Sequence, residues 1–257
     1  MEFIIIAVVA FGAAILTFFS GFGLGTILTP VFMIFFPIDL AIALTGVVHF
    51  FNNIFKIILV GKDANKSVLI RFGIPSVIAA FLGAWVLLKI PDSNPLFSYT
   101  LFDRYFEVSP VEFVIAILLI VFALMDLIPK FKRLEFDKSK LPLGGFLSGF
   151  FGGLSGHQGA LRTAFLIKSG LSKEAFIGTA VVVSTFVDFT RLGVYATRFS
   201  TSGLIDNIQL VLVGTISAIC GAFIGKKLLK KVTLDFVQTL VAVLLILLSV
   251  ALGLGWL

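Results

Sequence analysis

The chain has 257 residues, of which 59% are hydrophobic and only 13% are charged, and its mean hydropathy is +1.12. A soluble domain carries about 25% charged residues, so this composition excludes an ordinary soluble protein and predicts an integral membrane protein. The apolar runs are long and continuous, which favours an all-α membrane fold over a barrel. The net charge of +6 does not indicate nucleic-acid binding, because the basic residues gather in the loops between apolar runs.

The first half of the chain, residues 1–129, begins with an apolar run over 2–36 that is interrupted by glycines at Ser20-Gly21-Phe22-Gly23-Leu24-Gly25-Thr26. Glycines at alternate positions are poor helix interior, and unpaired backbone groups are tolerated at membrane depth only inside protein or beside a wet cavity. We therefore expect a broken helical hairpin over 2–36. Continuous membrane helices are expected over 40–61, 67–89 and 110–129, with a loop over 91–109. No basic residue precedes the first run, so its helix is expected to be retained rather than cleaved.

The second half, residues 142–257, follows a basic linker over 130–141 and repeats this layout. A second glycine break, Gly152-Gly153-Leu154-Ser155-Gly156-His157-Gln158-Gly159, divides an expected hairpin over 142–168. Membrane helices are expected over 173–195, 205–226 and 233–256. Paired interrupted segments in two halves indicate the substrate site of a secondary transporter.

The distribution of charge predicts the orientation in the membrane. If each hairpin returns the chain to the side from which it entered, one side receives 13 basic residues and the other receives 3. Cytoplasmic loops are enriched in Lys and Arg, so the linker should be cytoplasmic and both termini extracytoplasmic. The basic side carries Lys62, Lys66, Lys130, Lys132, Arg133, Lys138, Lys140, Lys168, Lys173, Lys226, Lys227, Lys230 and Lys231.

Three crossings in each half give the two halves opposite orientations, which predicts inverted-topology repeats. Short residue matches agree with this arrangement. A shift of 134 places Gly25 on Gly159, and a shift of 135 places Asn53 on Asp188.

Two polar stripes lie on the expected helices 40–61 and 173–195. The first contains Thr45, His49, Asn52, Asn53 and Lys56, and the second contains Thr179, Ser184, Asp188 and Arg191. Charged side chains inside a membrane usually face the bundle interior, so both stripes should face a central axis. Three structural alternatives stay open: Lys56 could reach toward the interface, Asp188 and Arg191 could form only an internal ion pair, and His49 could simply donate to a carbonyl.

The second break carries His157, Gln158 and Arg162 at or just after the expected bend. The free N–H groups at the start of the returning half-helix, near Gly159, would point the same way as Arg162, and Gly25 and Thr26 offer the same device in the first break. Two such helix ends with Arg162, and with Lys56 or Arg191, suit a small anion. Asn52 and Asn53 would orient it, and Asp188 or His49 could couple transport to protons.

At these residues the chain resembles the TauE/SafE family of sulfite-exporter-like membrane permeases. The resemblance is carried by Ser20 to Pro30, by the helix from Ala41 to Asn53, and by Gly152 to Ala160 with Arg162. It implies transport of sulfur-containing anions, such as sulfite or organosulfonates, across the cell membrane.

The sequence thus predicts a secondary transporter for a small anion that works by alternating access, with lipid and protons as its further partners. An anion channel and a cation or other organic-solute carrier remain alternatives, and a homodimer is one assembly that the sequence allows. No enzyme is expected, because the chain has two histidines, one cysteine and no His-Glu-x-x-His or Gly-x-Ser-x-Gly spacing. The single cysteine also excludes a multi-cysteine zinc site, and neither a metal nor a cofactor is expected.

Overall fold

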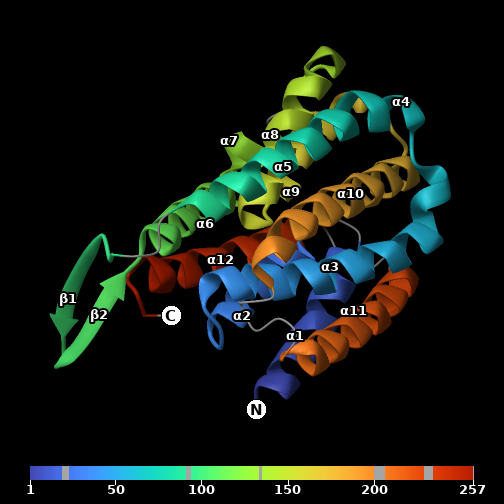
Figure 1. Ribbon diagram of the computed structural model, residues 1–257. Coiled ribbons are helices and arrows are strands. Elements are labelled where there is room, and N and C mark those ends of the chain that lie inside the picture. The colour runs from blue at the N-terminus through green and yellow to red at the C-terminus, as the bar shows by residue number, and fades with distance from the viewer. Residues whose placement is uncertain (19–22, 91–93, 133–134, 200–205, 229–233, 257) are drawn as a thin grey trace.

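The computed structural model of the chain is mostly helical (Figure 1). It describes residues 1–18, 23–90, 94–132, 135–199, 206–228 and 234–256. The first half contains α1 (Glu2–Thr17), α2 (Leu24–Met33), α3 (Ile38–Val60), α4 (Lys66–Val68), α5 (Ile74–Lys89) and α6 (Pro110–Leu127). The second half contains α8 (Leu141–Ser155), α9 (Gly159–Leu166), α10 (Lys173–Phe199), α11 (Ile208–Leu228) and α12 (Leu234–Gly253). Short helical turns join them: η1 (Gly61–Asp63), the π-helix η2 (Leu69–Gly73), α7 (Pro129–Lys132), η3 (Lys138–Lys140) and η4 (Ile167–Ser169).

Five helical stretches in the described part of the chain are long and apolar enough to cross a membrane. They are Leu40–Asp63, Lys66–Lys89, Pro110–Leu127, Lys173–Ala196 and Ile208–Lys227. These stretches confirm the prediction of a mostly helical membrane protein. The orientation stays a prediction, and three of its basic residues, Arg133, Lys230 and Lys231, lie outside the described residues.

Two helix pairs, α5 with α8 and α1 with α11, pack at very short range. A Cβ atom at Gly149 of α8 would overlap the backbone carbonyl of Ser76 in α5, and one at Gly221 of α11 would overlap the carbonyl of Phe11 in α1. Membrane helices gain little from the hydrophobic effect between them and associate by close packing over small residues. Glycine is therefore required at these contacts for its lack of a side chain.

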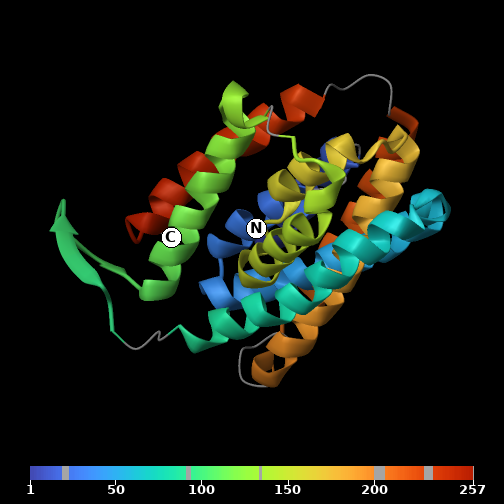
Figure 2. The same cartoon turned by 90° about the horizontal axis from the view of Figure 1, so that it is seen from above.

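Helices α6 and α12 pack against each other on one flank of the bundle (Figure 2). This pair contacts the rest of the bundle mainly at the two short helices: α12 packs against α2, and α6 packs against α9. Helices α3 and α10 pack against each other on the other side of these short helices. The short helices α2 and α9 therefore lie between two pairs of longer helices.

A β-hairpin corrects the all-helical expectation and the loop expected over 91–109. Strands β1 (Phe97–Leu101) and β2 (Arg104–Val108) are antiparallel, and they project beyond the start of α6 (Figure 1). The two turn residues, Phe102 and Asp103, both have positive φ, at 50° and 59°, as a two-residue hairpin turn of type I′ requires. The hydroxyl of Tyr99 donates to the carbonyl of Leu254 at 2.6 Å, which ties the hairpin to the segment after α12.

Candidate functional site

Both glycine breaks separate two helices. Helix α1 ends at Thr17 and α2 begins at Leu24 after Gly23, whose φ is +113°, while Ser20, Gly21 and Phe22 of the predicted break lie outside the described residues. In the second break, α8 ends at Ser155, Gly156 has φ +79°, and α9 begins at Gly159. Only residues 156–158 are non-helical there, so Gly152 and Gly153, which were expected in the bend, belong to α8. They are needed as small residues: a Cβ at Gly153 would overlap the carbonyl of Ala80.

The two breaks lie next to each other and next to α3. A Cβ atom at Gly25, in the first turn of α2, would lie 3.9 Å from the carbonyl oxygen of Gly156 and 3.8 Å from the Cδ2 atom of His49. The backbone of Thr26 lies beside the imidazole of His157. Pro30 has no N–H to donate to the carbonyl of Thr26 one turn earlier, so the structure leaves this acceptor without its helical partner.

A buried ionic network joins α3 to α10. One carboxylate oxygen of Asp188 lies 3.0 Å from Nε and 2.9 Å from Nη2 of Arg191. Its other oxygen lies 2.6 Å from Nδ1 of His49 and accepts a hydrogen bond from the amide of Asn53 at 3.1 Å. All four side chains are buried. A contact this short between an imidazole nitrogen and a carboxylate requires a proton on Nδ1, which leaves Nε2 of His49 able to take a second one.

Arg162 lies in the first turn of α9 and is only 1% exposed. Its guanidinium donates to two neutral oxygens of α10, the carbonyl of Ala180 at 2.9 Å and the hydroxyl of Ser184. Among the described residues, no carboxylate comes within 4.0 Å of it. The charge of Asp188 acts on Arg162 from beyond that distance. A buried charge without a directly paired partner costs several kcal/mol, so Arg162 is a costly buried cation with no direct ion pair among the described residues.

Lys56 is a second buried cation, with 3% of its surface exposed. Its ammonium group lies 5.6 Å from the ring centroid of Phe18, and it also feels the charge of Arg162. In the part of the chain that the structure describes, it has no ion pair. Lys56 therefore does not extend to the membrane surface, which was one of the two interpretations that its position near the end of α3 allowed.

Several buried polar atoms around the breaks have no hydrogen-bond partner within the described parts of the chain. They are Oγ1 of Thr45, both amide atoms of Asn52, Nε2 of His157 and Oε1 of Gln158. A buried polar group without a partner costs about 1–3 kcal/mol, so these atoms are available to bond to a ligand or to water. All five atoms belong to residues of α3 or of the second break.

The structure thus divides the residues that the sequence singled out. His49, Asn53, Asp188 and Arg191 pair with one another, while Arg162, Lys56, Asn52, His157 and Gln158 keep unused capacity. Arg191 is not remote from the second set, because a Cβ at Gly156 would lie 2.7 Å from its Nη1 atom. Thr179, by contrast, accepts from the backbone N–H of Asn65 and has a structural role.

Sequence reasoning missed Tyr195 and Ser148, two residues that hold the second break in place. The hydroxyl of Tyr195 in α10 donates to the carbonyl of Gly153 at 2.5 Å, and the hydroxyl of Ser148 donates to the carbonyl of Gln158 at 3.2 Å. Nδ1 of His157 lies 2.7 Å from the carbonyl oxygen of Ser155, which fixes the orientation of the ring. The sequence did contain a signal for Tyr195, because it lies one helical turn after Arg191 and so on the same face of the helix.

Chemically, the arrangement offers positive charge and hydrogen-bond donors deep in a membrane-spanning bundle. The N–H groups of the first turns of α2 and α9 have no intrahelical partners, and the helix dipoles add partial positive charge at the same ends. Arg162 and Lys56 have no ion pair within the described residues, and together with these helix ends they favour a small anion over a cation.

Comparison with known protein families identifies the family of the chain. The family model described as sulfite exporter TauE/SafE matches residues 6–252, nearly the whole chain. Comparisons with curated proteins and with solved structures gave no match. On the strength of the family match and of its apolar helices, the chain is a multi-pass membrane transport protein that belongs to the TauE/SafE sulfite exporter family.

Proposed function

We propose that the protein is a secondary transporter that binds a small anion, such as sulfite or an organosulfonate, between the two helix breaks. The observation that carries this proposal is Arg162, a buried guanidinium whose hydrogen-bond acceptors among the described residues are two neutral oxygens. Charged groups of this kind inside a membrane are expensive and mark ion or substrate sites. A bound anion would supply the missing counter-charge.

The remaining groups have complementary roles in this proposal. The N–H groups at Gly25, Thr26 and Gly159 would donate to the anion, and the amide of Asn52 would supply a further hydrogen bond. Gln158, whose Oε1 has no partner, would offer its amide N–H or accept from a protonated substrate. Lys56 adds positive charge beside Arg162.

In this proposal the two histidines are the groups that couple transport to protons. Nδ1 of His157 lies 2.7 Å from the carbonyl oxygen of Ser155, so the proton of the neutral ring is on Nδ1 and Nε2 keeps a lone pair, which would repel an anion placed beside it. Binding would therefore favour either protonated His157 or a substrate that carries its own proton, such as hydrogen sulfite. His49, held by Asp188, can take its second proton on the ring edge that faces α2.

The helix contacts support the proposed inverted repeat. If α1, α2, α3, α5 and α6 correspond to α8, α9, α10, α11 and α12, exchanging the halves turns the α5–α8 contact into α11–α1, and both pairs occur. The contacts α3–α10 and α6–α12 map onto themselves, as pairs on a pseudo-two-fold axis must. Asn53 and Asp188, which match at a shift of 135 residues, meet at 3.1 Å.

We further propose that alternating access moves one repeat against the other around this site, with the linker over 130–141 in the cytoplasm and both termini outside it. The cation-carrier alternative is weakened by Asp188, because His49, Asn53 and Arg191 already occupy its two oxygens. A channel with the same site differs from a carrier only in its gating, so saturable counterflow would distinguish the two.

The proposal can be tested by thermal unfolding of the purified protein with sulfite, sulfate, thiosulfate, sulfoacetate and simple carboxylates at two pH values. A ligand at 100 times its Kd stabilises the folded state by about 2.7 kcal/mol, so the right anion should raise the Tm. The Arg162→Ala variant should lose this shift while the Lys168→Ala variant, which removes an exposed lysine paired with Glu135, should keep it. A shift that survives Arg162→Ala would place the anion elsewhere.

A further inference from the structure

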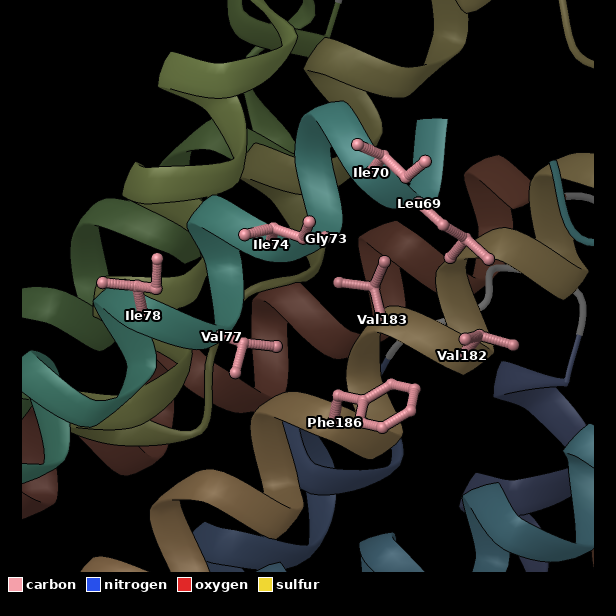
Figure 3. Close-up of a pocket in the computed structure, with 9 residues that line it drawn as sticks. All are labelled: Leu69, Ile70, Gly73, Ile74, Val77, Ile78, Val182, Val183 and Phe186. Atoms are coloured by element: carbon pink, nitrogen blue, oxygen red, sulfur yellow. The ribbon is translucent and has the colours of Figure 1, made fainter. Parts of the chain in front are cut away.

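An apolar groove of about 370 Å³ lies on the side of the bundle (Figure 3). Its lining differs from that of the proposed anion site, which is polar and charged. One wall runs from Leu69 to Ile78 in η2 and α5, and the other from Val182 to Phe186 in α10. Every lining residue is apolar. An apolar cavity of about 150 Å³ already holds a benzene molecule, so this groove has room for a longer hydrocarbon.

The local backbone creates the hollow. η2 is a π-helical turn, which inserts an extra residue into the helix and is often found at functional sites. Gly73 ends this turn and has no side chain to fill the space. A Cβ atom at this position would point toward α10 and lie 3.4 Å from Cγ2 of Val183. The hollow is thus part of the fold of this helix.

The groove opens toward hydrocarbon. Both helices that form it belong to stretches that qualify as membrane spans, Lys66–Lys89 and Lys173–Ala196. Its rim residues Ile70, Ile74 and Phe186 are all more than half exposed. A face of this kind within a membrane span meets lipid chains and not water.

The length of the groove matches one leaflet. Leu69 and Ile78 are nine residues apart, or about 14 Å at ~1.5 Å per helical residue. The hydrocarbon core of a bilayer is about 30 Å thick, so the groove is about as long as one leaflet is thick.

Basic side chains stand at one end of the groove. Lys66 lies one turn before Ile70 on the same helical face. Arg71 lies in the middle of η2, and Lys173 is the first residue of α10. All three side chains are exposed. With Lys62 they outnumber the acidic residues at this end, Asp63 and Glu174. A phosphate headgroup is the complementary partner for such a cluster.

We propose that this groove binds an acyl chain of an anionic phospholipid, whose headgroup phosphate lies at Lys66 and Arg71. The leaflet is the one at the Lys66 end, which is cytoplasmic in the orientation proposed above. Val183 in the groove precedes Ser184, the residue that accepts from Arg162. The bound chain therefore packs against the segment of α10 that holds the buried arginine.

The site can be probed with a single tryptophan in nanodiscs. In a background with Trp85→Phe and Trp256→Phe, Phe186→Trp places the reporter at the groove and Ile216→Trp places it on α11, where the side chain is 61% exposed. Phosphatidylglycerol and phosphatidylcholine with brominated chains are compared as quenchers at equal low mole fractions. The Phe186→Trp reporter should prefer the anionic lipid by ~5-fold in apparent affinity for each basic side chain that contacts the phosphate, and the Ile216→Trp reporter should show no preference.

Two further variants test the parts of the site separately. Lys66→Gln with Arg71→Gln should remove the preference for the anionic lipid, and Gly73→Leu, which fills the groove, should reduce quenching of the Phe186→Trp reporter by both lipids. Equal quenching at the two reporter positions would reduce the groove to ordinary lipid contact and overturn the proposal. Absence of quenching at Phe186→Trp by either lipid would mean that protein, such as a second copy of the chain, covers the groove.

Discussion

Replacing Asp188 by Asn should destabilise the protein by about 3–5 kcal/mol, because it leaves a buried arginine charge without its partner. Asp188 is 0% and Arg191 1% exposed, and the guanidinium makes contacts of 3.0 and 2.9 Å to one carboxylate oxygen. The Asn side chain keeps the shape and one acceptor but loses the charge. At about 2–4 °C per kcal/mol for a chain of this length, the Tm should fall by ~6–20 °C.

The measurement is thermal unfolding of the detergent-purified variants at a fixed scan rate, arranged as a double-mutant cycle. Removing both charges with Asp188→Asn and Arg191→Leu should recover much of the loss, since replacing a whole buried pair by neutral groups is often nearly neutral. A Tm for Asp188→Asn within about 2 °C of the parent protein, or a double variant that is less stable than either single one, would refute this reasoning.

Three other predictions concern packing, protons and the hairpin. Gly149→Ala should destabilise the protein by about 1–3 kcal/mol or more through overpacking against Ser76. The control Gly193→Ala, with nothing within 4 Å of its Cβ, should leave the Tm unchanged or raise it. Equal losses of Tm in the two variants would contradict the close contact at Gly149. His49→Gln keeps a donor for Asp188 but cannot take a proton, so it should retain anion binding and lose anion-dependent proton uptake. Proton uptake is measured with a pH dye in proteoliposomes, and unchanged uptake would show that His49 has no part in the coupling. Tyr99→Phe loses the hydrogen bonds to Leu254 and from Trp256, each contributing about 0.5–1.5 kcal/mol, and should speed hydrogen exchange over residues 251–256 but not in α10.

The burial of Arg162 and the interruption at Gly156 could be predicted because the membrane permits few alternatives. A charge in an apolar segment must face protein, and a backbone break at that depth must be covered. The structure agrees on both points, with Arg162 1% exposed and Gly156 in a left-handed conformation.

Partner choice could not be predicted in the same way. Asn52 and Asn53 are neighbours in one polar stripe, yet Asn53 bonds to Asp188, whereas the side chain of Asn52 has no hydrogen-bond partner among the described residues. Adjacent residues on a helix point about 100° apart, and which of the two faces α10 depends on how the helices are rotated in the bundle. Sequence spacing defines the stripe but does not fix that rotation.

The β-hairpin was missed although its pattern was present in the sequence. Apolar and polar residues alternate over Phe97–Leu101, and Phe102-Asp103 forms the two-residue turn. The turn lacks the Asn-Gly or Asp-Gly pair that marks most such hairpins. The bonds that hold this one, from Tyr99 and Trp256, join segments more than 150 residues apart.

The most direct test of the anion site is counterflow of radiolabelled sulfite into proteoliposomes loaded with unlabelled sulfite. The parent protein should show saturable counterflow, Arg162→Lys should retain part of it because the positive charge is kept, and Arg162→Ala should abolish it while remaining folded by size-exclusion chromatography. Sulfite counterflow through a folded Arg162→Ala variant at the parent rate would contradict the account.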